Sequence, residues 1–402
     1  MSRARGAGRV LAGYLPPLLV AVVAAPWIIA GGHAWPWHPA MVDLDVYREA
    51  GRTLLTGGDI YTMKAGGLYF IYPPFAALLA VPLALVGPVV AELVWLMLVV
   101  GAQQAVLRRC GIPAGWRLGL IGAGVIIAVE PIRTTLGYGQ VNTLLMALVV
   151  LDLLPDPGRR SGRWHGVGIG LAAAIKLTPA LFGVFALVAR RARIAWTSAA
   201  AFVLVTGVSA ALLPGDSRRF WTGDIPAGTS GPQYVGNASL TGLTTRWFGT
   251  GAEPRVAGLV LGVAVCLLAL VIARHWWLGG HPVFAVALVG LATNLASPLA
   301  WTHHFVWVLP LLVAVLTDAR LPRWVRGVGL AWAAWISIQL PLTVLPYAFG
   351  AAAHYTWWQD LLGNVTPLVG LAFYLGLALD LVRVRFSARR APVPAASAMS
   401  GR

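Results

Sequence analysis

The sequence predicts an all-α polytopic membrane protein, and three observations support this. Hydrophobic residues make up 58% of the 402-residue chain and Asp, Glu, Lys and Arg only 11%, whereas soluble domains are about 45–50% apolar and about 25% charged. Apolar runs long enough to cross a bilayer, about 17–25 residues, recur along the whole chain. Clusters of arginine separate these runs, as in the cytoplasmic loops of membrane proteins. An ordinary cytosolic enzyme and a disordered chain are excluded.

The first apolar run, 10–30, is long for a signal peptide and lacks a clear cleavage site, so we expect a retained helix. The other clear spans are 88–107, 194–213, 256–273, 327–345 and 364–382, and the shorter ones are 73–87, 118–131, 142–155, 282–297 and 305–317. Segment 166–189 is interrupted by Lys176 and Pro179, which favours a hairpin of two short helices over one straight span.

The arginine clusters set the expected topology. If all of them face the cytoplasm, both termini are cytoplasmic, 166–189 turns back on itself and only one half of 73–107 crosses. This gives about 12 transmembrane helices in a single domain, 1–387, followed by a disordered cytoplasmic tail, 388–402. The formal net charge of +16 is then an orientation signal, and no nucleic-acid partner is expected.

Two outer segments are long, 31–72 and 214–255. In the first, apolar residues at helical spacing alternate with charged ones between Val46 and Thr56, which predicts a helix lying at the membrane interface. In the second, Arg246 is placed to reach a lipid headgroup.

Asp43 and Asp45 follow the first span directly and precede Tyr47. A carboxylate in a partly dry crevice is a suitable general base for a hydroxyl group. Either aspartate could instead cap the helix that follows, since Asp is a favoured N-cap. The pair, with Tyr47 beside it, favours a functional site.

Other polar residues lie near the same face. The candidates are Arg133, Gln140, Asn142, Lys176, His303 and His304. Ionisable groups at membrane depth are costly and mark a site or pathway by default. Each has a structural alternative: Arg133 could pair with Glu130, Lys176 with a carboxylate, and the histidines could belong to an interfacial belt. Tyr72 is more typical of an aromatic belt.

Several signatures are missing from the sequence. It contains no P-loop, no GxGxxG opening a soluble nucleotide fold and no DxD triplet of the nucleotide-sugar type, so an activated donor must come through the membrane. The two cysteines and the adjacent histidines form no metal-ligand cluster, and no cofactor or metal is expected. No repeat relates the two halves, which argues against a typical secondary transporter.

The chain resembles the polyprenyl-phosphate-mannose-dependent mannosyltransferases of actinobacteria, which are integral-membrane enzymes of the GT-C class (glycosyltransferase family 87). The resemblance is carried by segments 43–47, 72–75, 139–142, 176–179 and 297–304. The resemblance covers most of the chain. It implies a GT-C fold in which the first periplasmic loop, 31–72, carries a catalytic aspartate, matched here by Asp43 with Asp45 in reserve.

The resemblance also implies a reaction. Mannose passes from polyprenyl phosphate to a glycolipid, most like a phosphatidylinositol mannoside, by an inverting single displacement that forms an α-1,2 linkage on the periplasmic face of the plasma membrane. His304, His303, Lys176 and Arg133 are candidates to stabilise the leaving phosphate. The expected substrate-binding residues further include Asp45, Tyr47, Tyr72, Gln140, Asn142 and Arg246.

Alternatives remain open at this point. They are an arabinofuranosyltransferase, a lipomannan-branching mannosyltransferase and, in another class, a glycolipid flippase. The expected partners are the lipid-linked sugar donor, the glycolipid acceptor and membrane lipids, with no protein partner implied.

Overall fold

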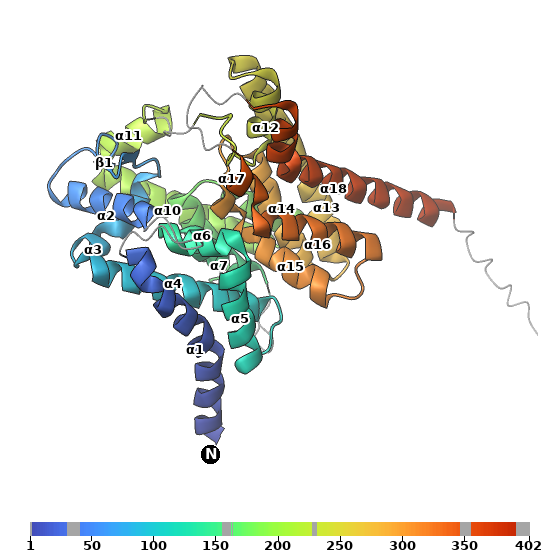
Figure 1. The fold of residues 1–402 in the computed structure, drawn as a ribbon, viewed down its shortest axis with the longest axis horizontal. Coiled ribbons are helices and arrows are strands. Elements are labelled where there is room, and N and C mark those ends of the chain that lie inside the picture. Colours follow the sequence, from blue (N-terminus) through green and yellow to red (C-terminus); the bar gives the residue numbers. More distant parts are fainter. Residues whose placement is uncertain are drawn as a thin grey trace, which may run out of the picture.

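The computed structural model describes residues 2–29, 41–154, 162, 164–226, 231–345 and 355–390. Within these ranges the chain is helical apart from a short antiparallel hairpin of β1 (Lys64–Ala65) and β2 (Leu68–Tyr69). Figure 1 shows the N-terminal helices and the C-terminal helices on opposite sides of the molecule, with α6 and α7 between them. The predicted all-α fold class is confirmed.

The N-terminal side contains α1 (Ser2–Ile29), α2 (Val42–Leu55), α3 (Pro74–Ala84), α4 (Pro88–Arg109), α5 (Trp116–Ala128), α6 (Glu130–Tyr138), α7 (Asn142–Leu153), α8 (Val167–Ile175), α9 (Ala180–Val188) and α10 (Ala192–Leu212). Then follow α11 (Pro214–Thr222), α12 (Leu240–Phe248), α13 (Ala252–Leu278), α14 (Pro282–Ala296), the 3₁₀ helix η1 (Thr302–Trp307), α15 (Val308–Thr317), α16 (Arg323–Ile338), α17 (Leu340–Val344) and α18 (Trp357–Arg390). Proline stands in the first turn of α3, α4, α6, α11 and α14, where its missing N–H costs no helical hydrogen bond.

Five helical segments in the described ranges are long and apolar enough to cross a membrane, and six if the bent pair α5–α6 counts as one span. They are α4, α10, α13, α16 with α17, and the part of α18 up to Arg383. Shorter apolar helices lie at most of the other predicted spans. The chain is therefore a multi-pass membrane protein, while the expected twelve crossings are not established by helix length. Within 73–107, α4 has spanning length and α3, with 11 residues, does not.

The predicted hairpin is present at Lys176. Helix α8 ends just before this residue and α9 begins just after Pro179. Gly170 of α8 and Gly183 of α9 both lie against Ser198 of α10, so the chain returns to the same level after the break. The two short helices therefore form a hairpin with Lys176 at its apex.

The predicted interfacial helix corresponds to α2, which begins four residues earlier than expected and carries Asp43 and Asp45 in its first turn. The preceding part of the first outer loop, 30–40, lies outside the described residues. At the other end, α18 continues to Arg390, three residues into the predicted tail, and 391–402 lie outside the described residues.

Helix α14 forms the centre of the C-terminal side. Every residue of it from Phe284 to Leu295 is buried, as expected for a helix that is apolar all round. It packs against α13, α15 and η1, and η1 in turn contacts α6 and α7. The end of α14 and η1 therefore face the loops of the N-terminal side, and the candidate site lies at that junction.

Candidate active site

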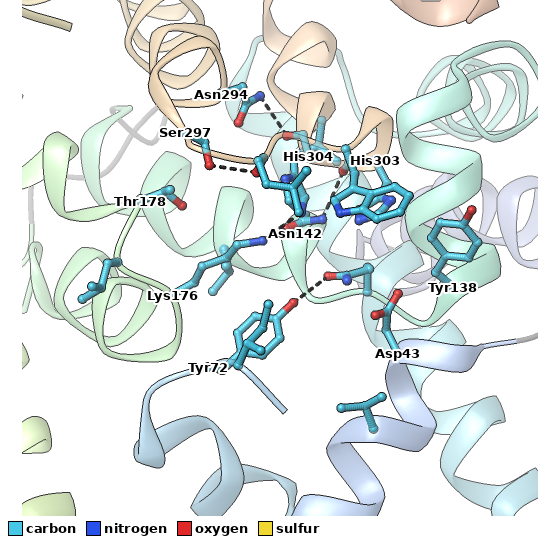
Figure 2. A pocket seen from close by; sticks show the side chains of 18 of the residues that line it. Asp43, Tyr72, Tyr138, Asn142, Lys176, Thr178, Asn294, Ser297, His303 and His304 are labelled. Atoms are coloured by element: carbon cyan, nitrogen blue, oxygen red, sulfur yellow. Dashed lines mark hydrogen bonds between the residues drawn. The ribbon is translucent and has the colours of Figure 1, made fainter. Parts of the chain in front are cut away.

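A cavity of about 770 Å³ lies between the two sides of the molecule. Its polar lining residues are Asp43, Tyr69, Tyr72, Tyr138, Gln140, Asn142, Lys176, Thr178, Thr293, Asn294, Ser297, Trp301, His303 and His304, and Val46, Leu68, Ile71, Phe182, Phe220 and Trp307 are among its apolar ones. These residues come from α2, the β1–β2 hairpin, the α6–α7 turn, the α8–α9 turn and the α14–η1 segment. Figure 2 shows Asp43, Tyr72, Lys176 and His304 arranged around this common space. A polar centre with an apolar wall suits a lipid that carries a polar head.

Asp43 is placed by the contact between α2 and the end of α6. The Met41 N–H donates to the Gly137 carbonyl at 2.7 Å, which ties the start of α2 to α6. Gly139 follows α6 with φ +68°, and a Cβ there would lie 2.6 Å from the Leu44 Cβ. Only glycine satisfies both the left-handed conformation and this close approach. The first residue of α2 is not capped by a side chain, so the structure does not support the capping role considered for Asp43 and Asp45.

Gln140 connects Asp43 with two tyrosines. Its Oε1 accepts hydrogen bonds from the hydroxyls of Tyr47 at 3.1 Å and Tyr72 at 3.3 Å. The amide nitrogen is therefore left to donate to the Asp43 carboxylate. Burial raises the pKa of Asp43 to about 6, and the Gln140 hydrogen bond and the charge of Lys176 partly offset that rise. The pKa of the Asp43 carboxylate is thus close to neutral pH, as suits a general base.

Lys176 lies at the other polar end of the cavity. Its ammonium donates to Oδ1 of Asn142 at 3.1 Å, lies 3.2 Å from Nε2 of His304 and is 5.6 Å from the centre of the Tyr72 ring. These hydrogen-bond partners are neutral, and the Asp43 carboxylate acts on Lys176 through its charge without an ion-pair contact. A half-buried ammonium hydrogen-bonded to neutral groups retains its attraction for an anion, so this end of the cavity suits a phosphate.

The segment that carries the histidines is held by hydrogen bonds to its backbone. The carbonyl of His303 accepts from Thr135 Oγ1 at 3.0 Å and from Asn142 Nδ2 at 3.1 Å, and that of His304 accepts from Asn294 Nδ2 at 2.9 Å. The His303 ring stacks on Trp301, with centroids 6.0 Å apart and planes at 17°. His304 faces Lys176, while His303 belongs to an aromatic wall of the cavity.

Four predicted site residues lie away from the cavity lining: Asp45, Tyr47, Arg133 and Arg246. Tyr47 is buried behind it and reaches the cavity through its hydrogen bonds to Tyr72 and Gln140. Asp45 points outward, with its side chain 54% exposed, and pairs with Arg48 at 3.5 Å. Arg133 donates to the Ile127 carbonyl. The expectation that Asp45 and Arg133 bind substrate therefore stays a prediction that the cavity lining does not support. Asp43 and Asp45 lie on opposite faces of the first turn of α2, which explains why their surroundings differ.

Arg246 also lies outside the cavity lining. Its guanidinium is hydrogen-bonded to Oδ1 of Asn364 and to the carbonyls of Tyr234 and Asn237, so it ties α12 to α18 and to the 231–239 loop. Asn237, the acceptor of a glycosylation pattern in the sequence, is fully buried and bonded to the 297–300 loop through Pro298 and Ala300. Both residues therefore have structural roles.

Other lining residues were not predicted as site residues. Tyr138, Thr178 and Trp301 each lie two positions from a predicted site residue, and Ser297 belongs to the same 297–304 segment as His303; that proximity was the available signal. Asn294 lies within the apolar helix α14, where an uncharged polar residue is costly unless it has a partner. Among the described residues no three His, Cys, Asp or Glu side chains gather as a metal site would require.

Residues 70–298 match the family model of glycosyltransferase family 87, a segment that begins after Asp43 and ends before the two histidines. No solved structure matches the chain.

Curated relatives align over most of the chain. The polyprenol-phosphate-mannose-dependent alpha-(1-2)-phosphatidylinositol mannoside mannosyltransferase of Mycolicibacterium smegmatis is 32% identical over 80% of this chain and 82% of its own length. Its Mycobacterium tuberculosis counterpart is 32% identical over 84% and 86%. The corresponding phosphatidylinositol pentamannoside mannosyltransferase of M. smegmatis is 33% identical over 81% of both chains.

Proposed function

The chain belongs to glycosyltransferase family 87, and from this premise we propose that it transfers mannose from polyprenol-phosphate-mannose to a phosphatidylinositol mannoside, forming an α-1,2 linkage. The names of its relatives give the donor, the acceptor class and the linkage. Relatives named for a phosphatidylinositol mannoside and for its pentamannoside form are equally similar to this chain, at 32% and 33% identity. The proposal therefore extends to the acceptor class and leaves the number of mannoses on the acceptor to experiment.

One observation carries the proposal: a single cavity joins a half-buried carboxylate, Asp43, to a half-buried ammonium, Lys176. A glycosyl transfer from a lipid phosphate needs these two groups, one to accept the proton of the attacking hydroxyl and one to stabilise the phosphate that leaves. The apolar wall around Leu68, Ile71 and Phe220 suits the lipid portions of the substrates.

In the proposed reaction the Asp43 carboxylate takes the proton of an acceptor hydroxyl. The hydroxyl oxygen forms a bond to the anomeric carbon of mannose, and the bond from that carbon to the phosphate oxygen breaks with its electron pair going to the phosphate. Lys176 stabilises the added negative charge. Attack opposite the leaving group inverts the anomeric centre, so a β-linked donor gives an α-linked product.

The membrane placement is part of the proposal. We place the fold in the GT-C class with about twelve crossings, both termini in the cytoplasm and the cavity at the periplasmic face of the plasma membrane. The arginine clusters between the apolar segments support this orientation. In this placement the first turn of α2, with Asp43 at the cavity and Asp45 exposed, is on the periplasmic side.

The test is product analysis with the wild-type protein in lipid vesicles. Labelled polyprenol-phosphate-mannose is supplied with phosphatidylinositol mannosides of increasing mannose number, and each product is digested with an α-1,2-specific mannosidase. The proposal predicts one additional mannose that this enzyme removes. A product resistant to it, or no product on any acceptor, would overturn the proposed linkage or the proposed reaction.

A further inference from the structure

Helix α6 and the turn after it contact both polar ends of the cavity. In the first turn, Oε1 of Glu130 accepts from Thr302 Oγ1 at 2.9 Å, and further along the helix Thr135 Oγ1 donates to the His303 carbonyl at 3.0 Å. At its end, the Gly137 carbonyl accepts from the N–H of Met41, which opens α2. The first set of contacts holds the segment of the histidines, and the second holds the helix of Asp43.

The residues that make the first set of contacts are buried and do not line the cavity. Glu130 is 7% exposed and Thr135 is fully buried, and neither is among the lining residues. They therefore touch the substrates only through the 3₁₀ helix η1. That helix is short and of poorer hydrogen-bond geometry than an α-helix, so it depends on such outside contacts for its position.

Both ends of helix α6 are fixed. Its start is set by an 80° bend from α5 with Pro131 in the first turn, and its end by the left-handed Gly139 packed on Leu44. Contacts to the η1 segment come from both Glu130 and Thr135 of the same helix that contacts α2. The element thus acts as a rigid bridge between α2 and η1.

We propose that α6 sets the separation between the Asp43 carboxylate and the Lys176–His304 pair, with Glu130 and Thr135 as its positioning residues. The inference rests on the proposed function, because the two ends matter together only when one substrate is attacked while another group leaves. A displacement of about 1 Å at such a site can lower the rate about a hundredfold. Substrate binding depends on the lining residues and is preserved.

The test uses full-length protein in vesicles and two pairs of variants. Thr135→Val keeps the side-chain shape and removes the donor, while Thr135→Ser restores it. Glu130→Met removes the acceptor, while Glu130→Gln keeps a carbonyl oxygen in its place. We expect Thr135→Val and Glu130→Met to lower kcat about tenfold to a hundredfold with the donor KM within about twofold. Thr135→Ser and Glu130→Gln should stay within about threefold of wild type.

The matched control is Thr134→Val. Thr134 donates to the same Glu130 oxygen at 2.7 Å but, among the described residues, makes no hydrogen bond to η1, so its loss should leave kcat within about twofold. If Thr135→Val retains the wild-type kcat, or if kcat, donor binding and Tm fall together in it as for a general loss of folding, the positioning role is overturned. Should Glu130→Met not fold, the isosteric Thr135→Val decides the question alone. Failure of the wild-type protein to transfer mannose would instead overturn the proposed function.

Discussion

The ammonium of Lys176 lies 3.2 Å from Nε2 of His304, and this contact determines which atom of the imidazole carries the proton. An ammonium group has three donors and no acceptor, so Nε2 must be the acceptor and the proton must be on Nδ1. His304 is therefore neutral in this arrangement. Together with Oδ1 of Asn142 it engages two of the three Lys176 donors and leaves one for an incoming phosphate.

A first prediction concerns His304 as an acceptor. His304→Gln keeps an acceptor, its amide oxygen, for the Lys176 ammonium, whereas His304→Ala removes it. We expect His304→Gln to retain kcat within about tenfold and His304→Ala to lose at least about tenfold more, since an unsatisfied buried donor is costly. Steady-state mannose transfer measures both. Equal loss in the two variants would indicate that His304 acts as a proton donor instead.

A second prediction concerns the charge of Lys176. Lys176→Met keeps much of the apolar length and removes the ammonium that is proposed to stabilise the leaving phosphate. We expect kcat to fall about a hundredfold to a thousandfold. Lys176→Arg, which keeps the charge with a different shape, should recover part of that loss. A Lys176→Met variant with wild-type kcat and a raised donor KM would show that the charge serves binding alone.

A third prediction is the acid side of the pH–rate profile. The pKa of Asp43 is raised to about 6, so below that pH the carboxyl is protonated and cannot accept the hydroxyl proton. The rate should therefore fall as the pH drops through about 6. Gln140→Leu removes a hydrogen bond that favours the charged form, so the pKa of Asp43 and the acid limb should move to higher pH. An acid limb that stays in place in this variant would mean that another group controls it.

A fourth prediction separates Arg246 from the chemistry. Arg246→Met leaves the buried acceptors of Asn364, Tyr234 and Asn237 without their donor, which should cost about 1–3 kcal/mol of stability for each acceptor left unsatisfied. Thermal unfolding in detergent measures this as a lower Tm. The control is Arg52→Met, whose half-exposed ion pair with Glu49 should contribute only about 0–1 kcal/mol. Equal Tm values for the two variants would contradict the structural role of Arg246.

Local features of the site could be predicted from the sequence. The hairpin at Lys176 follows from two short apolar segments flanked by arginines, and α2 from its spacing of apolar residues. The clustering of Asp43, Gln140, Asn142, Lys176 and His304 agrees with expecting them all on one face of the membrane. A shared membrane face would bring segments that are distant in the sequence to one plane, which is why these residues could be expected near one another from the sequence.

Pairings across the chain could not be predicted. Thr135 and His303 are separated by 168 positions, and nothing in either local pattern indicates the other. The same holds for Arg246. From the sequence, an arginine in an outer loop is as compatible with binding a lipid headgroup as with a hydrogen bond to Asn364 inside the protein. For Asp43 and Asp45 the missing information was the rotation of α2, since two residues along a helix point to different sides.

The position of Asp45 makes it the control for Asp43. Both aspartates lie in the first turn of α2, yet only Asp43 lines the cavity, while Asp45 is 54% exposed and pairs with Arg48. Asp→Asn changes charge and proton affinity with almost no change in shape. Any general effect of such a change on α2 should therefore appear in both variants.

The central claim is that Asp43 is the base of the transfer reaction, and one measurement tests it most directly: the rate of mannose transfer by Asp43→Asn and Asp45→Asn under identical conditions. Binding of labelled polyprenol-phosphate-mannose to each variant is recorded in the same preparation. The account predicts that Asp43→Asn binds the donor but transfers at least about a hundredfold more slowly, while Asp45→Asn stays within about threefold of wild type. Transfer by Asp43→Asn at the wild-type rate, or a larger loss in Asp45→Asn, would contradict it.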